Sequence, residues 1–145
     1  MSAENEALVR RLFEEVWNQG NMSAAKEIVH EDYTSPDGPF WITTPESSGG
    51  WPGRYSEAGL ETLEQEMESY RETYSDLRFE MERTFSEKNV VITTWRATGI
   101  VKGEFFTNRA GRELPVELGS KGMCWSRIAD GKIIENRLYW PRRSR

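Results

Sequence analysis

Apolar residues in the first part of the chain recur with helical spacing. From about Ala3 to Asn18 they return every three or four positions, with Glu and Arg on the opposite side. The stripe consists of Leu8, Leu12, Phe13, Val16 and Trp17. Gly20 ends this pattern, and Asn21 or Ser23 can cap a short second helix over 24–29. The pattern therefore predicts two helices at the start of the chain.

The segment 34–55 lacks any regular period. It holds four of the six prolines together with Trp41 and Trp51, a composition typical of a loop. We interpret it as a lid or pocket rim, because two tryptophans in a loop favour a use in binding, and ordinary loop packing is the alternative. Ser56 can then cap a third helix that runs to about Tyr74. Its buried stripe would contain Leu60, Leu63, Met67, Tyr70 and Tyr74.

From Leu77 onward the hydrophobic period changes to two, which predicts strands. A strand beginning at Leu77 is followed by a long one over 90–101 and by a hairpin tip at 107–111. The stretch 123–140 reads as two strands joined by a tight turn, in which Gly131 is free to take a positive φ. Helices first and strands afterwards predict an α+β fold with an antiparallel sheet, in one domain over residues 1–145.

The last two predicted strands carry an unusual inward face. Alternation places Cys124 and Ser126 on one side of the first strand, and Asn136 and Trp140 on the matching side of the second. This face is too polar for an ordinary core. It indicates a lined cavity.

Composition narrows the classes of partner. The chain has 145 residues and a formal net charge of −5, which argues against nucleic acid or an anionic membrane as its partner. Its one cysteine excludes an internal disulfide and offers no zinc cluster. The acidic, polar start is unlike a secretory signal, and no apolar run is long enough to span a bilayer, so we expect a cytoplasmic protein.

The sequence RIADGKIIEN at 127–136 resembles the closing hairpin of SnoaL-like polyketide cyclases, in the nuclear transport factor 2-like superfamily. The order of helices, loop and strands agrees with that resemblance over nearly the whole chain. It implies a cone-shaped α+β domain in which a curved antiparallel sheet wraps around the N-terminal helices and a pocket. It also implies a small hydrophobic ligand, no metal or other cofactor, and a homodimer formed through the outer sheet face.

The resemblance also suggests a catalytic base. In the related ketosteroid isomerases, an aspartate five residues beyond a position that matches Asp32 acts as the base, and the same count here leads to Asp37. The alternative is that Pro36-Asp37-Gly38 is simply a turn. Asn136 is the second catalytic candidate, as a polar anchor that can donate and accept a hydrogen bond; a structural hydrogen bond is its alternative.

Aromatic side chains can form the walls of the expected pocket. The substrate-binding candidates are Tyr33, Trp41, Trp51, Trp95, Cys124, Ser126 and Trp140. Flat aromatic walls suit a planar or polycyclic ligand, although the same residues can also be ordinary core. For Cys124, the alternative to a pocket thiol is a small buried hydrophobe.

Two positions depart from the isomerases: Phe13 stands where they have an oxyanion-binding tyrosine, and Cys124 where they have an acid.

The resemblance as a whole implies a function: cofactor-free cyclisation or isomerisation of a hydrophobic, polyketide-like natural-product intermediate by acid/base chemistry. Three alternatives stay open: a binding or dimerisation module without turnover, a cofactor-independent hydroxylase of an aromatic polyketide, and a domain whose pocket has collapsed.

Overall fold

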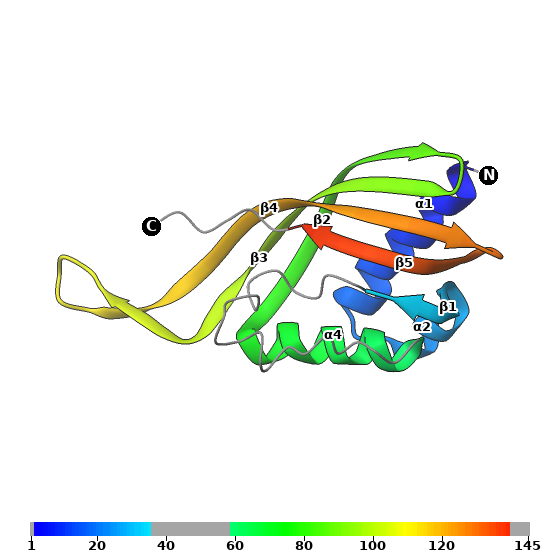
Figure 1. Ribbon diagram of the computed structural model, residues 1–145. Helices are drawn as coiled ribbons and strands as arrows, with labels where there is room; N and C mark the ends of the chain where they lie inside the picture. The colour runs from blue at the N-terminus through cyan, green and yellow to red at the C-terminus, as the bar shows by residue number, and fades with distance from the viewer. Residues whose placement is uncertain (1, 36–58, 140–145) are drawn as a thin grey trace, which may run out of the picture.

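The computed structural model describes residues 2–35 and 59–139, in which helices pack against one curved sheet (Figure 1). The order of elements confirms the expected α+β class. The elements are α1 (Ser2–Arg11), the π-helix η1 (Leu12–Trp17), α2 (Met22–Ile28), β1 (Val29–Thr34), α4 (Leu60–Thr73), β2 (Tyr74–Glu87), β3 (Val90–Thr107), β4 (Glu113–Ala129) and β5 (Lys132–Tyr139). The predicted loop 34–55 lies almost entirely outside the described residues.

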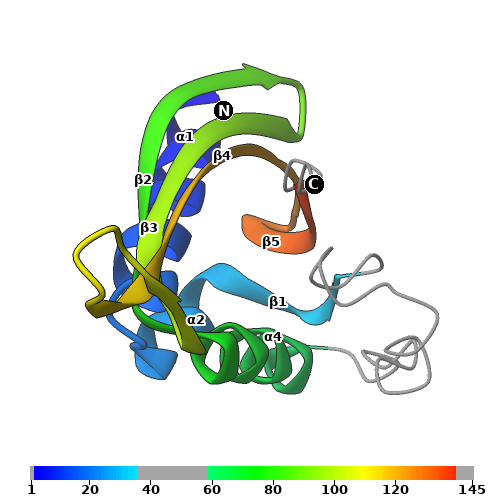
Figure 2. The same cartoon turned by 90° about the vertical axis from the view of Figure 1, so that its left-hand side faces the viewer.

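The sheet has five strands in the order β1-β5-β4-β3-β2. Strands β2 to β5 pair antiparallel, as the sequence predicted, whereas β1 pairs parallel with β5. The sheet is therefore mixed, and it curls round without closing (Figure 2). The sequence predicted no strand at β1, because this run is short, mostly polar and without strict alternation. In the structure it buries only Val29 and Tyr33.

The first predicted helix changes geometry before it ends. Beyond α1 the helix widens into η1, where the amide of Asn18 donates to the carbonyl of Phe13, 3.0 Å away and five residues earlier. The side chain of Asn18 then bonds both the N–H and the C=O of Phe79 on β2, at 2.7 and 2.8 Å. The wider turn lets both Phe13 and Trp17 meet the ring of Phe79, each with ring centroids 5.8 Å apart.

Two local predictions are confirmed. Asn21 caps α2 by accepting a 3.1 Å hydrogen bond from the amide of Ala24. Asp130 and Gly131 both have positive φ, +53° and +74°, between β4 and β5. Positive φ at both central residues is the conformation that matches the twist of a two-residue hairpin.

The core lies between the helices and the inner face of the sheet. Side chains from α1, η1, α2 and α4 meet the buried face of β2 to β5 there. Trp95 on β3 packs edge-on against Phe79 at 5.3 Å and is fully buried. Its ring covers Gly122 on β4, where a Cβ would collide with it. We call the mutually contacting rings of Phe13, Trp17, Tyr70, Phe79 and Trp95 the aromatic layer; through Trp95 it packs against the inner face of β4.

Candidate functional site

Three polar side chains are buried together on the inner face of β4 and β5. Ser126 pairs directly with Asn136 in the β4–β5 register, and Cys124 lies two residues earlier on the same face. The Oδ1 atom of Asn136 accepts hydrogen bonds from Ser126 Oγ at 2.6 Å and from Cys124 Sγ at 3.0 Å. Both donors use this one oxygen, so the amide NH₂ of Asn136 is left to donate elsewhere.

A buried carboxyl group belongs to α4. Glu66 is only 2% exposed, and both of its oxygens accept hydrogen bonds. Tyr33 Oη donates to Oε1 at 2.8 Å, and Ser35 Oγ donates to Oε2 at 2.6 Å. Burial raises the pKa of Glu66 to about 7, although the two hydroxyl donors oppose that rise by stabilising the ionised form. Near neutral pH the carboxyl group therefore exists in both protonation states.

The carboxyl group and the β4–β5 group lie in one region. Burial raises the pKa of Cys124 to about 12, and the negative charge of Glu66 adds to that rise. The pKa of Tyr33 is raised well above its ordinary value by burial, by Glu66 and, more weakly, by Cys124. We call the set of Tyr33, Ser35, Glu66, Cys124, Ser126 and Asn136 the interior polar cluster.

Thr93 adjoins this cluster from β3. It pairs with Cys124 in the register between β3 and β4 and is fully buried. Its hydroxyl has no hydrogen-bond partner within the described part of the chain. Because buried hydroxyls are usually paired, Thr93 adds an unused polar group to the inner face of the sheet.

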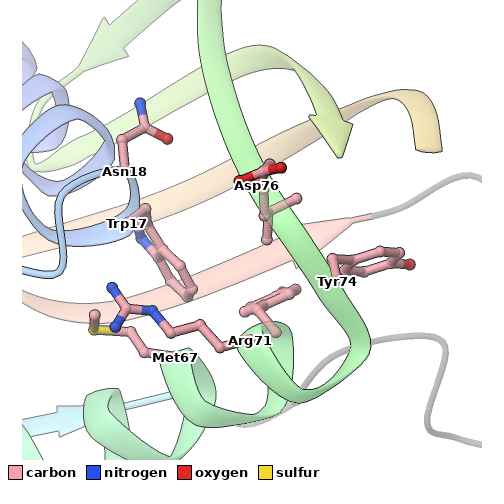
Figure 3. A pocket seen from close by; sticks show the side chains of 8 residues that line it. Trp17, Asn18, Met67, Arg71, Tyr74 and Asp76 are labelled. Atoms are coloured by element: carbon pink, nitrogen blue, oxygen red, sulfur yellow. The ribbon is translucent and has the colours of Figure 1, made fainter. Parts of the chain in front are cut away.

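A hollow opens beside the C-terminal half of α4. It has a volume of ≈ 180 Å³ and lies between the end of η1, the C-terminal half of α4 and the start of β2. Figure 3 shows the side chain of Arg71 reaching from α4 toward Trp17. Tyr70 lines this hollow and also contributes to the raised pKa of Tyr33. Tyr70 therefore adjoins both the hollow and the interior polar cluster.

The sequence-predicted site residues fall into two groups. Tyr33, Trp95, Cys124, Ser126 and Asn136 are described, and all five are buried. Of these, Trp95 belongs to the aromatic layer, whereas the other four join the interior polar cluster. The remaining candidates, Asp37, Trp41, Trp51 and Trp140, lie outside the described residues.

Glu66 was not among the residues that the sequence analysis selected. The signal was present in the sequence: Glu66 lies three residues after Leu63 and four before Tyr70, on the stripe predicted to be buried. The helix contains four other glutamates, and a glutamate-rich helix usually indicates a solvent-exposed charged face. Glu66 was therefore not distinguished from the exposed glutamates. Position on the helix, rather than residue type, distinguishes Glu66 from its neighbours.

No group of three or more His, Cys, Asp or Glu side chains suited to a metal ion occurs within residues 2–35 and 59–139. In the same part of the chain, no helix combines the length and the apolar character needed to cross a bilayer.

Comparisons with known proteins add the family. The chain resembles solved structures that include a candidate SnoaL-like polyketide cyclase from Jannaschia sp. CCS1, with 21% identity, coverage of 95% of this chain and 85% of the other, and a TM-score of 0.68. A candidate polyketide cyclase from Acidithiobacillus ferrooxidans has 18% identity, coverage of 98% and 91%, and a TM-score of 0.70. AclR, a candidate hydroxylase from Streptomyces galilaeus, has 19% identity, coverage of 97% and 91%, and a TM-score of 0.62.

At these identities the structural likenesses establish the fold, and the sequence match establishes the family. No curated protein matches the chain. The family model for SnoaL-like polyketide cyclases matches residues 7–142, which is nearly the whole sequence. The chain belongs to the SnoaL-like polyketide cyclase family.

Proposed function

We propose that this protein is a cofactor-free enzyme that closes a ring in, or isomerises, a hydrophobic polyketide-like intermediate. The observation that carries the proposal is Glu66, a buried carboxyl group with a pKa of about 7. An acid/base catalyst works best when its pKa lies near the working pH, because it must both take up and return a proton. Family membership supports a polyketide-like substrate.

In the proposed reaction, the ionised carboxylate of Glu66 removes a proton from a carbon beside a substrate carbonyl. The resulting enolate attacks a second carbonyl of the same molecule, so that a carbon–carbon bond forms and the second oxygen becomes an alkoxide. The carboxylic acid of Glu66 then returns its proton to that oxygen. In isomerisation the same proton returns to a different carbon.

Asn136 has a supporting role in this proposal. Its Oδ1 is held by Ser126 and Cys124, which fixes the amide and leaves its N–H groups to donate to a substrate carbonyl oxygen. A donor fixed in advance stabilises a developing oxyanion without reorganising during the reaction. Cys124 is neutral in this scheme, because a thiol with a pKa of about 12 is not a nucleophile near neutral pH.

The test compares two glutamates on the same helix. A panel of polyketide-like substrates is assayed with the wild type, Glu66→Gln and the exposed-site control Glu64→Gln. We expect Glu66→Gln to lower kcat by roughly 100-fold or more, the usual contribution of a positioned acid/base group, with Glu64→Gln unchanged. Full turnover by Glu66→Gln would exclude Glu66 as the acid/base group. Including Asp37→Asn asks whether the base suggested by the family resemblance takes that role instead.

A second candidate function is binding without turnover. It is favoured by the closed hydrogen bonding of Glu66, whose two oxygens are both occupied by Tyr33 and Ser35. Saturable quenching of tryptophan fluorescence by panel compounds, with no product formed by the wild type, would select this function. Conversion of an aromatic compound to a hydroxylated product would select the hydroxylase alternative.

A further inference from the structure

Thr93 buries a hydroxyl group that the described part of the chain does not use. The residue lies on the inner face of β3 and has no exposed surface. Its Oγ1 has no hydrogen-bond partner among the described residues. Such a group loses its hydrogen bonds to water on folding and gains none in return, so it lowers the stability of the folded state. Buried polar groups are nearly always paired, and each exception therefore calls for an explanation.

The cross-strand neighbours of Thr93 direct their own donors elsewhere. Thr84 lies opposite it on β2, and the Thr84 hydroxyl donates to Glu6 of α1 at 2.7 Å. Cys124 lies opposite it on β4, and the Cys124 thiol donates to Oδ1 of Asn136 at 3.0 Å. The hydroxyl of Thr93 therefore stands beside the interior polar cluster and is available to a ligand.

A valine would suit this position on β3 better than a threonine. The side chains two residues away on the same face, Val91 and Trp95, are apolar and fully buried. Valine has nearly the shape of threonine without the hydroxyl, and it is among the residues that favour strands. The hydroxyl thus adds nothing to packing that a methyl group would not provide. Local conflicts of this kind between a residue and its surroundings are expected at functional sites.

A second donor without an acceptor lies across β4. The Oδ1 of Asn136 is held by Ser126 and Cys124, and the NH₂ of the same amide has no hydrogen bond to the rest of the described chain. Thr93 pairs with Cys124, and Asn136 pairs with Ser126, so the two donors flank β4 on its inner face. Two strand spacings of about 4.8 Å each separate their backbones. The two donors therefore suit two separate oxygens of one ligand.

We propose that Thr93 is a substrate-binding residue that, together with Asn136, selects ligands carrying two oxygen atoms. The NH₂ of Asn136 donates to one oxygen, and the hydroxyl of Thr93 donates to a second oxygen on the far side of the ligand. A ligand with both acceptors satisfies both donors, whereas a ligand with one leaves a buried donor unpaired and is bound more weakly. The proposal rests on the proposed function only in placing the ligand at the interior polar cluster.

The first measurement concerns the protein without a ligand. Urea unfolding compares the wild type with Thr93→Val, which removes the hydroxyl, and with Thr93→Ser, which keeps it. We expect Thr93→Val to leave the urea midpoint unchanged or to raise it, because the variant removes a polar group that has no partner. A lower midpoint for Thr93→Val would show that the hydroxyl is paired within the protein, and it would overturn the proposal.

The second measurement compares two ligands that share a tricyclic skeleton. Anthraquinone has a carbonyl group on each side of its central ring, whereas anthrone has only one. Their affinities are measured by quenching of tryptophan fluorescence. We expect the wild type to bind anthraquinone at least about tenfold more tightly than anthrone, because only anthraquinone satisfies both donors.

The variants assign that preference to one hydroxyl. Thr93→Val should lose the preference by weakening the binding of anthraquinone alone, and Thr93→Ser should retain it. The control is Thr94→Val, an equally conservative change at the next residue, whose Oγ1 instead accepts from the amide of Arg83 at 3.1 Å. This control should bind both compounds as the wild type does. Binding of neither compound by the wild type, equal affinity for the two, or a preference that survives in Thr93→Val would overturn the proposal.

Glu66→Gln separates this proposal from the proposed function. A preference for anthraquinone that depends on Thr93, together with full turnover of the substrate panel by Glu66→Gln, would remove the proposed reaction and leave the binding role of Thr93 in place. Turnover that depends on Glu66, together with unchanged binding of both compounds by Thr93→Val, would remove only the role of Thr93.

Discussion

The hydroxyl of Tyr33 lies 2.8 Å from Oε1 of Glu66, and both residues are almost completely buried. One comes from the strand at the edge of the sheet and the other from α4, so the bond joins two elements that are separated by the undescribed residues 36–58. A hydroxyl can donate to a carboxylate but gains less from a neutral acid. This contact therefore influences the protonation of Glu66 as well as the packing of α4 on β1.

Replacing Tyr33 by Phe should raise the pKa of Glu66 further above about 7. The variant keeps the ring in the core and removes a donor that favours the ionised carboxylate. A hydrogen bond to a charged group contributes about 1.5–3 kcal/mol, which sets the scale of the change. Carbon-13 NMR titration of the Glu66 carboxyl carbon measures it directly. Ser35→Ala should shift the titration in the same direction, and a fall in pKa in either variant would contradict this account.

The raised pKa of Glu66 also predicts how stability depends on pH. Between the ordinary carboxyl value of 4.5 and about 7, the folded state holds a proton that the unfolded state has lost. Stability from this group is complete below 4.5 and is lost as pH rises through about 7. At 1.36 kcal/mol per pKa unit, the loss is about 3 kcal/mol. Denaturant unfolding at a series of pH values should show this decline in the wild type.

Glu66→Gln is the matched variant for that measurement. Its amide does not ionise, so the decline between pH 5 and 8 should be much smaller than in the wild type. Glu64→Gln, on the outer side of the same helix, should keep the wild-type profile. Parallel profiles for the wild type and Glu66→Gln would show that another group is responsible.

Asn136→Leu should be destabilising although the new side chain is apolar and similar in size. The substitution removes the oxygen that accepts from both Ser126 and Cys124, and both donors are fully buried. A buried hydrogen-bonding group left without a partner costs about 1–3 kcal/mol. Urea unfolding measures the loss. Adding Ser126→Ala to Asn136→Leu should recover part of the lost stability, because Ser126→Ala removes the hydroxyl that Asn136→Leu leaves without its acceptor.

The sequence predicted what depends on local pattern. Alternation along 123–140 placed Cys124, Ser126 and Asn136 on one buried face, since each side chain direction follows from the pleat alone. The partners of that face were not predictable in the same way. Glu66 comes from a helix about 60 residues earlier in the sequence. Its residue type is the same as that of Glu64 and Glu68, and only its position on the predicted buried stripe distinguishes it. The parallel strand β1 and the π-turn of η1 likewise depend on distant contacts, with β5 and with Phe79.

Cys124 should be unreactive in the folded protein. Its pKa of about 12 leaves almost no thiolate at pH 7.5, and the side chain is fully buried. We expect reaction with a chromogenic disulfide reagent to follow unfolding in denaturant, with one thiol released per chain, as the sequence contains one cysteine. Rapid reaction in native buffer would indicate a thiolate and would revive a nucleophilic role for this residue.

Two glycines on β4 provide a test of the aromatic layer. A Cβ at Gly122 would collide with the ring of Trp95 and with the carbonyl oxygen of Tyr139, whereas a Cβ at Gly119 would meet nothing within 4 Å. Neither residue has a positive φ, so steric overlap alone separates them. Gly122→Ala should cost about 1–3 kcal/mol or more, as overpacking in a close-packed core usually does. Gly119→Ala should change stability by no more than about 0.5 kcal/mol, as most surface substitutions do. Thermal unfolding of the two variants measures this difference. Equal stability of Gly122→Ala and Gly119→Ala would mean that Trp95 does not pack over Gly122 on β4.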